Sequence, residues 1–150
     1  MTTKGRMRKW GMQVDPKYIF CGASEESMDH IFFECIETYK VWRKVMSLCF
    51  IHKRKCGLAE DQKWMSKRWC KDTFANRLKK IVLAATVYYI WAARNRFIFQ
   101  HIPATTKQML TSIMNTVQEN IVSWRGIPKT KINWDLVMEW SLWHRIFYDV

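Results

Sequence analysis

The chain has 150 residues, of which 49% are hydrophobic and 15% aromatic, and its formal net charge is +12. This length predicts a single domain that can bury most of its apolar surface, and this composition excludes a disordered chain. The longest apolar run, residues 81–91, is shorter than the roughly 18 to 20 residues of a transmembrane helix, so we expect no membrane partner. The N-terminus lacks the apolar core of a secretory signal, so we expect an intracellular protein with reduced Cys.

The positive charge is concentrated in the middle of the chain. Residues 40–80 carry thirteen Lys and Arg against three acids, whereas residues 18–39 carry five acids and no Lys or Arg. A concentrated basic face favours polyanions such as nucleic acid. A solvated helix face that keeps an aromatic-rich protein soluble is the alternative, and both interpretations are open.

The periodicity predicts an all-α fold, a small helical domain in which a short Cys/His loop leads into a helix. A first short helix has a Thr cap near the start of the chain and ends at Gly11. A turn then leads to Cys21-Gly22, where glycine permits the tight, left-handed backbone of a metal knuckle. We expect one domain over 1–150, with regions 1–50, 51–102 and 103–150.

A second helix is predicted from about Met28 to Phe50, capped by Ser24 or Ser27. Its apolar residues recur at three- and four-residue steps and form one stripe: Phe32, Cys35, Tyr39, Trp42, Val45, Met46 and Cys49. His30 would lie in the first turn of this helix and Cys35 in the second. Both side chains could therefore face the preceding loop.

Cys21, His30 and Cys35 supply two thiols and one imidazole, the ligands that Zn²⁺ prefers. A closed structural zinc site has four ligands, so a fourth would come from elsewhere. Four residues are candidates by their chemistry: Cys49, His52, Cys56 and Cys70. The alternative is that the cysteines are small buried hydrophobes and His30 is an ordinary histidine at a helix cap.

The basic middle region is predicted to form a loop and then a short helix. Its Lys and Arg residues, with two from the following helix, are the candidate phosphate contacts: Lys53, Arg54, Lys55, Lys67, Arg68, Lys71, Lys79 and Lys80. Trp64 and Trp69 lie among them and could stack on the bases of single-stranded nucleic acid. Packing of both tryptophans in the core is the other interpretation, and the one we favour.

One long central helix is predicted from a cap at Thr73 to the region before Pro103. The residues expected on its inward face are Phe74, Leu78, Ile81, Ala85, Tyr88 and Ala92. Residues 81–91 are apolar nearly all round, so we expect other elements to cover this helix on several sides. The segment Arg94-Asn95-Arg96 restores polarity after that run.

Two further helices are predicted beyond Pro103. The first runs from Thr105 or Thr106 to Trp124, and the second begins at Asn133. The inward residues expected on the last helix are Val137, Trp140, Trp143 or His144, and Phe147. A segment this rich in tryptophan either packs on the central helix or forms an interface through which the protein self-associates.

These motifs resemble the zinc-binding domain that follows the polymerase in plant LINE-type (non-LTR) retrotransposon reverse transcriptases. The matching segments are Thr3–Met12, Cys21-Gly22, His30-Ile31-Phe32-Phe33-Glu34-Cys35, Val41-Trp42 and Leu83–Phe99. The family's first Cys falls on Tyr18, so this chain offers three of the family's four ligands. A phenol must ionise to bind a metal well, and we therefore expect Tyr18 to pack.

The resemblance implies a Zn²⁺ cofactor, nucleic acid as partner, and a location in the nucleus rather than the cytoplasm. The sequence has no Gly-rich phosphate loop, no nucleophile with a matched base and no paired carboxylates, so we expect no enzyme activity. We therefore predict a non-catalytic, retroelement-derived module that binds RNA or DNA. The alternatives are a metal-free helical scaffold for protein interaction and a decayed copy without a selected function.

Overall fold

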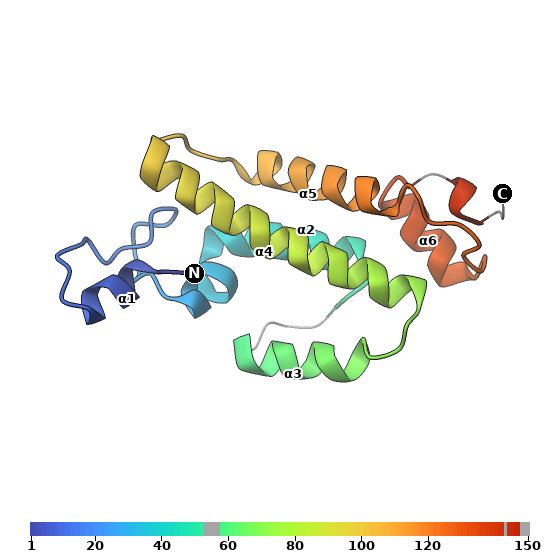
Figure 1. Cartoon of the computed structure of the whole chain (residues 1–150), viewed down its shortest axis with the longest axis horizontal. Coiled ribbons are helices and arrows are strands. Elements are labelled where there is room, and N and C mark those ends of the chain that lie inside the picture. Colours follow the sequence, from blue (N-terminus) through green and yellow to red (C-terminus); the bar gives the residue numbers. More distant parts are fainter. Residues whose placement is uncertain (53–57, 143, 148–150) are drawn as a thin grey trace.

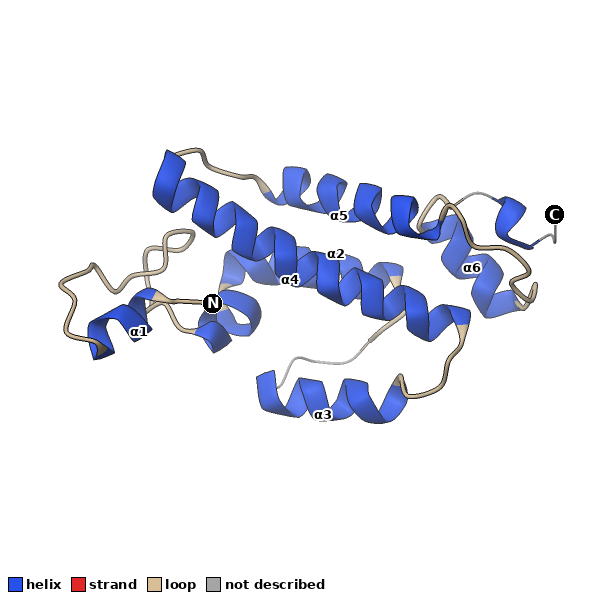
Figure 2. Ribbon diagram, viewed as in Figure 1, coloured by secondary structure: helices blue, strands red, loops and turns tan. Residues whose placement is uncertain are grey.

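The computed structural model describes residues 1–52, 58–142 and 144–147, and in these residues the fold is all-α, as predicted (Figures 1 and 2). The helices are α1 (Lys4–Lys9), the π-helix η1 (His30–Glu34), α2 (Ile36–Leu48), α3 (Leu58–Arg68), α4 (Phe74–Gln100), α5 (Thr106–Ile121), α6 (Lys131–Glu139) and the 3₁₀ helix η2 (His144–Phe147). The described residues contain no strand beyond one isolated bridge between Lys17 and Glu25. None of their helices combines the length and the apolar character that a transmembrane helix requires.

Helix α4 is the long central helix that the sequence predicts, and it contacts α2, α5, α6 and η1. Its first turn is capped by Thr73, whose Oγ1 accepts a hydrogen bond from the backbone N–H of Asn76 at 3.2 Å. It ends at His101, which has a left-handed backbone with φ of 56°. Helix α5 runs alongside α4 (Figure 1). Helix α1 and the loop of residues 10–27, named the metal-site loop because it carries the predicted ligand Cys21, lie near the C-terminal end of α4 (Figure 1).

Helix α5 follows its predicted apolar pattern but ends at Ile121, so the predicted end at Trp124 is wrong. A capping box joins Thr105 and Gln108 at its start, so the first backbone donors of the helix are satisfied by side chains. The predicted inward residues of this helix are buried: Met109, Ile113, Val117 and Ile121. Regular apolar spacing is sufficient to predict the buried residues of α5, because this helix packs on the rest of the molecule through one face.

The predicted inward face of α4 is wrong in its C-terminal half. Tyr88 was expected to point inward, but 63% of it is exposed. The buried residues of α4 are Phe74, Ala75, Leu78, Val82, Ala85, Thr86, Ile90, Ala93 and Arg94. The buried face shifts because the neighbours change along the helix: Phe74 packs on Trp124 at one end, and Arg94 pairs with Glu26 at the other.

The second predicted helix is divided into η1 and α2. Cys35 has an extended backbone and separates the two helices, so the predicted continuous helix over residues 28–50 is wrong at this residue. The break changes which side chains face inward. Thr38 is buried and donates a hydrogen bond to the Ile31 carbonyl at 2.8 Å, whereas Tyr39 is 41% exposed.

The tryptophan-rich C-terminus packs on the core in the residues that are described. Helix α6 is capped by Thr130 rather than by Asn133 and ends before Trp140, so the predicted bounds of this helix are wrong. Trp140 is fully buried, and its indole N–H donates to the Leu48 carbonyl at 3.1 Å. Trp143 and the side chain of His144 lie outside the described residues.

Candidate metal centre

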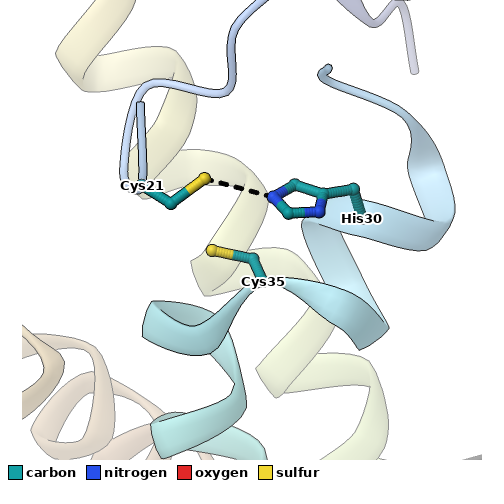
Figure 3. Close-up of side chains that lie close together, drawn as sticks. All are labelled: Cys21, His30 and Cys35. Carbon is teal, nitrogen blue, oxygen red and sulfur yellow. Dashed lines mark hydrogen bonds between the residues drawn. The ribbon is translucent and has the colours of Figure 1, made fainter. Parts of the chain in front are cut away.

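Three predicted ligands converge at the start of the second helical segment. The ligand atoms of Cys21, His30 and Cys35 all lie within 4.8 Å of one another. Figure 3 shows Cys21 on the loop, His30 on η1 and Cys35 at the start of α2, with the three side chains pointing toward a common centre. Residues up to fourteen positions apart are thus brought into one small site.

The π-helix η1 explains how His30 and Cys35 come to face the same side. The Cys35 N–H donates to the His30 carbonyl at 2.9 Å, a hydrogen bond that spans five residues. In an α-helix, five residues turn the side chain about 500°, which leaves the two side chains about 140° apart. The wider π turn reduces that divergence, and such turns occur frequently at functional sites.

The imidazole of His30 is held between a thiol and a carboxylate. Its Nε2 lies 3.2 Å from the Sγ of Cys21, and its Nδ1 lies 3.8 Å from a carboxylate oxygen of Glu34. Histidines that bind metals commonly direct the second ring nitrogen to a carboxylate, which orients the ring and raises the basicity of the ligand. Glu34 therefore lies on the side of His30 where such a partner would be, which the sequence did not predict.

A tight turn presents Cys21 to the site. The Gly22 N–H donates to the Tyr18 carbonyl at 2.8 Å, and the Tyr18 N–H donates to the Ser24 carbonyl at 2.9 Å. Gly22 has a left-handed backbone with φ of 61°, as the sequence predicted, and a side chain there would be strained.

The two thiols of the site differ in acidity. Burial pushes the pKa of Cys21 upward, but hydrogen bonds from the backbone of Ser24 and Ala23 and from the Cys35 thiol outweigh it, so this pKa lies below its ordinary value. Burial and the nearby charge of Cys21 raise the pKa of Cys35. A metal ion displaces protons from both thiols when it binds, because the thiolate is the ligand.

Tyr18 stands where the resemblance places a fourth ligand. The residue is fully buried, and its hydroxyl has no hydrogen-bond partner among the described residues. Burial, with the nearby charges of Cys35 and Glu26, raises the pKa of this phenol far above its ordinary value. The ring packs edge-on against His30, with centroids 5.6 Å apart, so Tyr18 contributes packing to the site.

The described candidates for a fourth ligand, Cys49, His52 and Cys70, do not join the cluster. Within the described residues, the metal-binding group consists of Cys21, His30 and Cys35 alone. Cys49 is buried in the hydrophobic core, where burial raises its pKa to about 12, and Cys70 is exposed. Cys56 lies outside the described residues.

A buried ion pair, which local sequence patterns did not predict, anchors the metal-site loop to the central helix. Glu26 is fully buried and Arg94 is 3% exposed, and the Arg94 Nε donates to Glu26 at 3.2 Å. Glu26 also accepts from the backbone N–H of Lys4 at 2.7 Å, which ties α1 to the same loop. Arg94 lies over the ring of Trp91 as well, 4.8 Å from its centroid. No local pattern pairs residues 68 positions apart.

The donor set fits a zinc ion. Cys21, His30 and Cys35 would hold it, and the ion would cross-link the loop, η1 and the start of α2.

No curated protein and no solved structure matches the chain. Residues 1–42 match the family model described as zinc-binding in reverse transcriptase, and these residues contain all three ligands. This N-terminal segment is therefore similar to the zinc-binding domain of reverse transcriptases.

Proposed function

We propose that the chain is a non-catalytic, nucleic-acid-binding module derived from a LINE-type retroelement. Zinc holds its N-terminal loop, and a basic cluster at the junction of α3 and α4 contacts phosphates. The family match to residues 1–42 supports the origin, and the resemblance of residues 83–99 to the same elements extends it beyond that match. The distribution of charge on α3 and α4 supports the partner.

The observation that carries this proposal is the exposure of the basic cluster. Four of its cations are exposed and close together in sequence: Lys67, Arg68, Lys71 and Lys80. The nearby Asp72 is paired with Arg77 at 3.1 Å, which leaves this carboxylate engaged with a residue outside the cluster. The remaining predicted contacts, Lys53, Arg54 and Lys55, lie outside the described residues.

Lys79, the fifth member of the basic cluster, lines a hollow of about 440 Å³ with Arg68, His52 and Trp64. Burial lowers the pKa of Lys79, and the positive charge of Arg68 lowers it further. A bound phosphate would relieve this repulsion, because it places a negative charge between the two cations. Trp69 is buried and packs edge-on against Trp64, with ring centroids 6.0 Å apart. Trp64 is half-buried, and its ring centroid lies 5.7 Å from the Arg68 guanidinium.

The test is the salt dependence of nucleic-acid binding by the zinc-loaded chain. We expect the affinity to fall steeply as salt rises, and the triple variant Lys67→Gln, Lys71→Gln, Lys80→Gln to lower the slope of log K against log salt by about 0.7 to 0.9 for each lost contact. The control removes the same charge elsewhere, from three exposed lysines: Lys9, Lys129 and Lys131. Equal slopes for the two triple variants would contradict the basic cluster, and no binding by the unmodified chain would contradict the function.

A self-associating scaffold is the alternative that the tryptophan-rich C-terminus suggested. Trp140 is buried and Trp134 stacks on Phe147, with ring centroids 5.6 Å apart. These side chains are therefore engaged within the chain, and we do not propose the scaffold as a second function.

A further inference from the structure

A hollow between α4 and α5 lies apart from both the metal centre and the basic cluster. Its volume is about 490 Å³, which is within the range of about 300 to 1,000 Å³ typical of sites for small organic groups. Its wall from α4 includes Tyr88, Tyr89 and Arg96, and its wall from α5 includes Lys107 and Thr111. The hollow is open to the surface, since Tyr88 is 63% exposed.

The aromatic wall of this hollow is held in place. The Tyr89 hydroxyl forms a hydrogen bond of 2.8 Å with the hydroxyl of Thr116 on α5. Tyr88 contacts Tyr89 at a steep angle of 84°, with ring centroids 5.1 Å apart. The exposed ring of Tyr88 is thus supported by a neighbour that is itself fixed. Exposed, supported aromatic rings are the surfaces on which single-stranded nucleic acids stack their bases.

A second hollow continues this surface along α4. It has a volume of about 370 Å³, shares Tyr88 and Arg96 with the first hollow, and extends to Asn95 and Phe99. Phe99 is 73% exposed, more than any other large hydrophobic residue that the structure describes. Tyr88 and Phe99 are eleven residues apart, or about 16 Å along the helix axis, which leaves room for a few successive nucleotides.

The charge of this surface favours a polyanion. No Asp or Glu occurs between Asp72 and Glu119, so α4 and the α5 residues that line the hollow contribute only positive charge. Arg96 and Lys107 are both exposed at its rim. A purely apolar partner would form no favourable electrostatic contact with these cations. A single strand of nucleic acid can stack its bases on the aromatic rings and place its phosphates beside the cations.

We propose that the hollow between α4 and α5 binds single-stranded nucleic acid, with a base stacked on Tyr88 and phosphates bound by Arg96 and Lys107. The proposal rests on the proposed function and adds a site that the basic cluster does not include. Lys79 and Tyr88 are nine residues apart, about two and a half turns, so they point to opposite sides of α4. The basic-cluster variant changes Lys67, Lys71 and Lys80, none of which lines either hollow, so the two sites can be tested separately.

The experiment measures binding of the zinc-loaded chain to a fluorescent oligothymidylate, to an abasic strand of the same length and to a duplex of the same length. We expect Tyr88→Ala to weaken binding of the oligothymidylate about tenfold and to leave binding of the abasic strand unchanged, because only the stacking is lost. Tyr88→Trp should preserve the affinity. Lys107→Gln should weaken both strands and lower the salt slope by about 0.7.

Two control variants make the result specific to the hollow. Tyr39→Ala removes an exposed tyrosine from α2, and Lys131→Gln removes an exposed lysine from α6, so neither changes the site. Circular dichroism checks that each variant is folded. If Tyr88→Ala and Lys107→Gln bind the oligothymidylate like their controls while the basic-cluster variant binds weakly, the site is overturned and the proposed function remains. If the unmodified chain binds none of the three probes, both are overturned.

Discussion

Residues 1–35, which build the candidate metal centre, contain only short helices and bury the polar side chains of Thr3, Glu26 and His30. Helix α5 buries apolar side chains alone and packs them along α4. Removing one partner of a buried ion pair lowers the free energy of unfolding by a large amount, because the other charge stays buried without its partner. Removing apolar atoms lowers it roughly in proportion to the apolar area that is no longer buried. The N-terminal region should therefore depend on a few individual residues, and the α4–α5 pair should depend on many.

The largest expected effect comes from breaking the ion pair that joins the two regions. Arg94→Met leaves the fully buried Glu26 carboxylate without its cation, and we expect the free energy of unfolding to fall by about 3 to 5 kcal/mol. Urea denaturation measures this loss. Hydrogen exchange should show the greatest loss of protection in residues 1–35.

Arg96→Met is the matched control, because Arg96 lies two residues further along α4 and is exposed. We expect a change within about 0.5 kcal/mol for this variant. Combining Arg94→Met with Glu26→Leu removes both charges and should recover much of the lost stability. A single variant Arg94→Met as stable as Arg96→Met would show that the ion pair does not hold the loop.

An intermediate effect is expected from zinc. Zinc at about one hundred times its dissociation constant should stabilise the chain by about 2.7 kcal/mol, measured by thermal or urea unfolding. The new protection from hydrogen exchange should lie in residues 18–38 and not in α5. The affinity for zinc should fall as pH is lowered, because both thiols and the imidazole must release protons to bind.

Cys21→Ser should abolish this stabilisation, while Cys70→Ser should preserve it, because Cys70 is an exposed thiol outside the metal-binding cluster. Elemental analysis of the reduced protein gives the zinc content of each variant. A folded, unmodified chain whose stability does not change with zinc would contradict the metal site.

The smallest effect is expected at Tyr18. Tyr18→Phe removes a buried hydroxyl that has no hydrogen-bond partner among the described residues, and we expect the stability to rise by about 1 kcal/mol. Zinc affinity should not change, because the phenol packs and does not bind the metal. A clear fall in zinc affinity for Tyr18→Phe would instead identify Tyr18 as the fourth ligand.

Local patterns predicted the regular helices and the identity of the three donors. The caps at Thr73 and Thr105, the apolar spacing of α5 and the glycine after Cys21 depend on neighbours within a few residues, and each is present in the structure. The break at Cys35 was missed because helical periodicity alone does not distinguish a π turn from an α turn.

The sequence by itself determined which chemical groups this protein carries: two thiols and an imidazole in one short segment, a basic middle region and a long apolar helix. Only the tertiary structure decided which groups meet. It pairs Glu26 with Arg94 and leaves Tyr88 exposed beside α5. Both outcomes arise because different elements pack on α4 along its length. The spacing of apolar residues in the sequence predicts which residues share a face of the helix, but it does not predict which element covers that face.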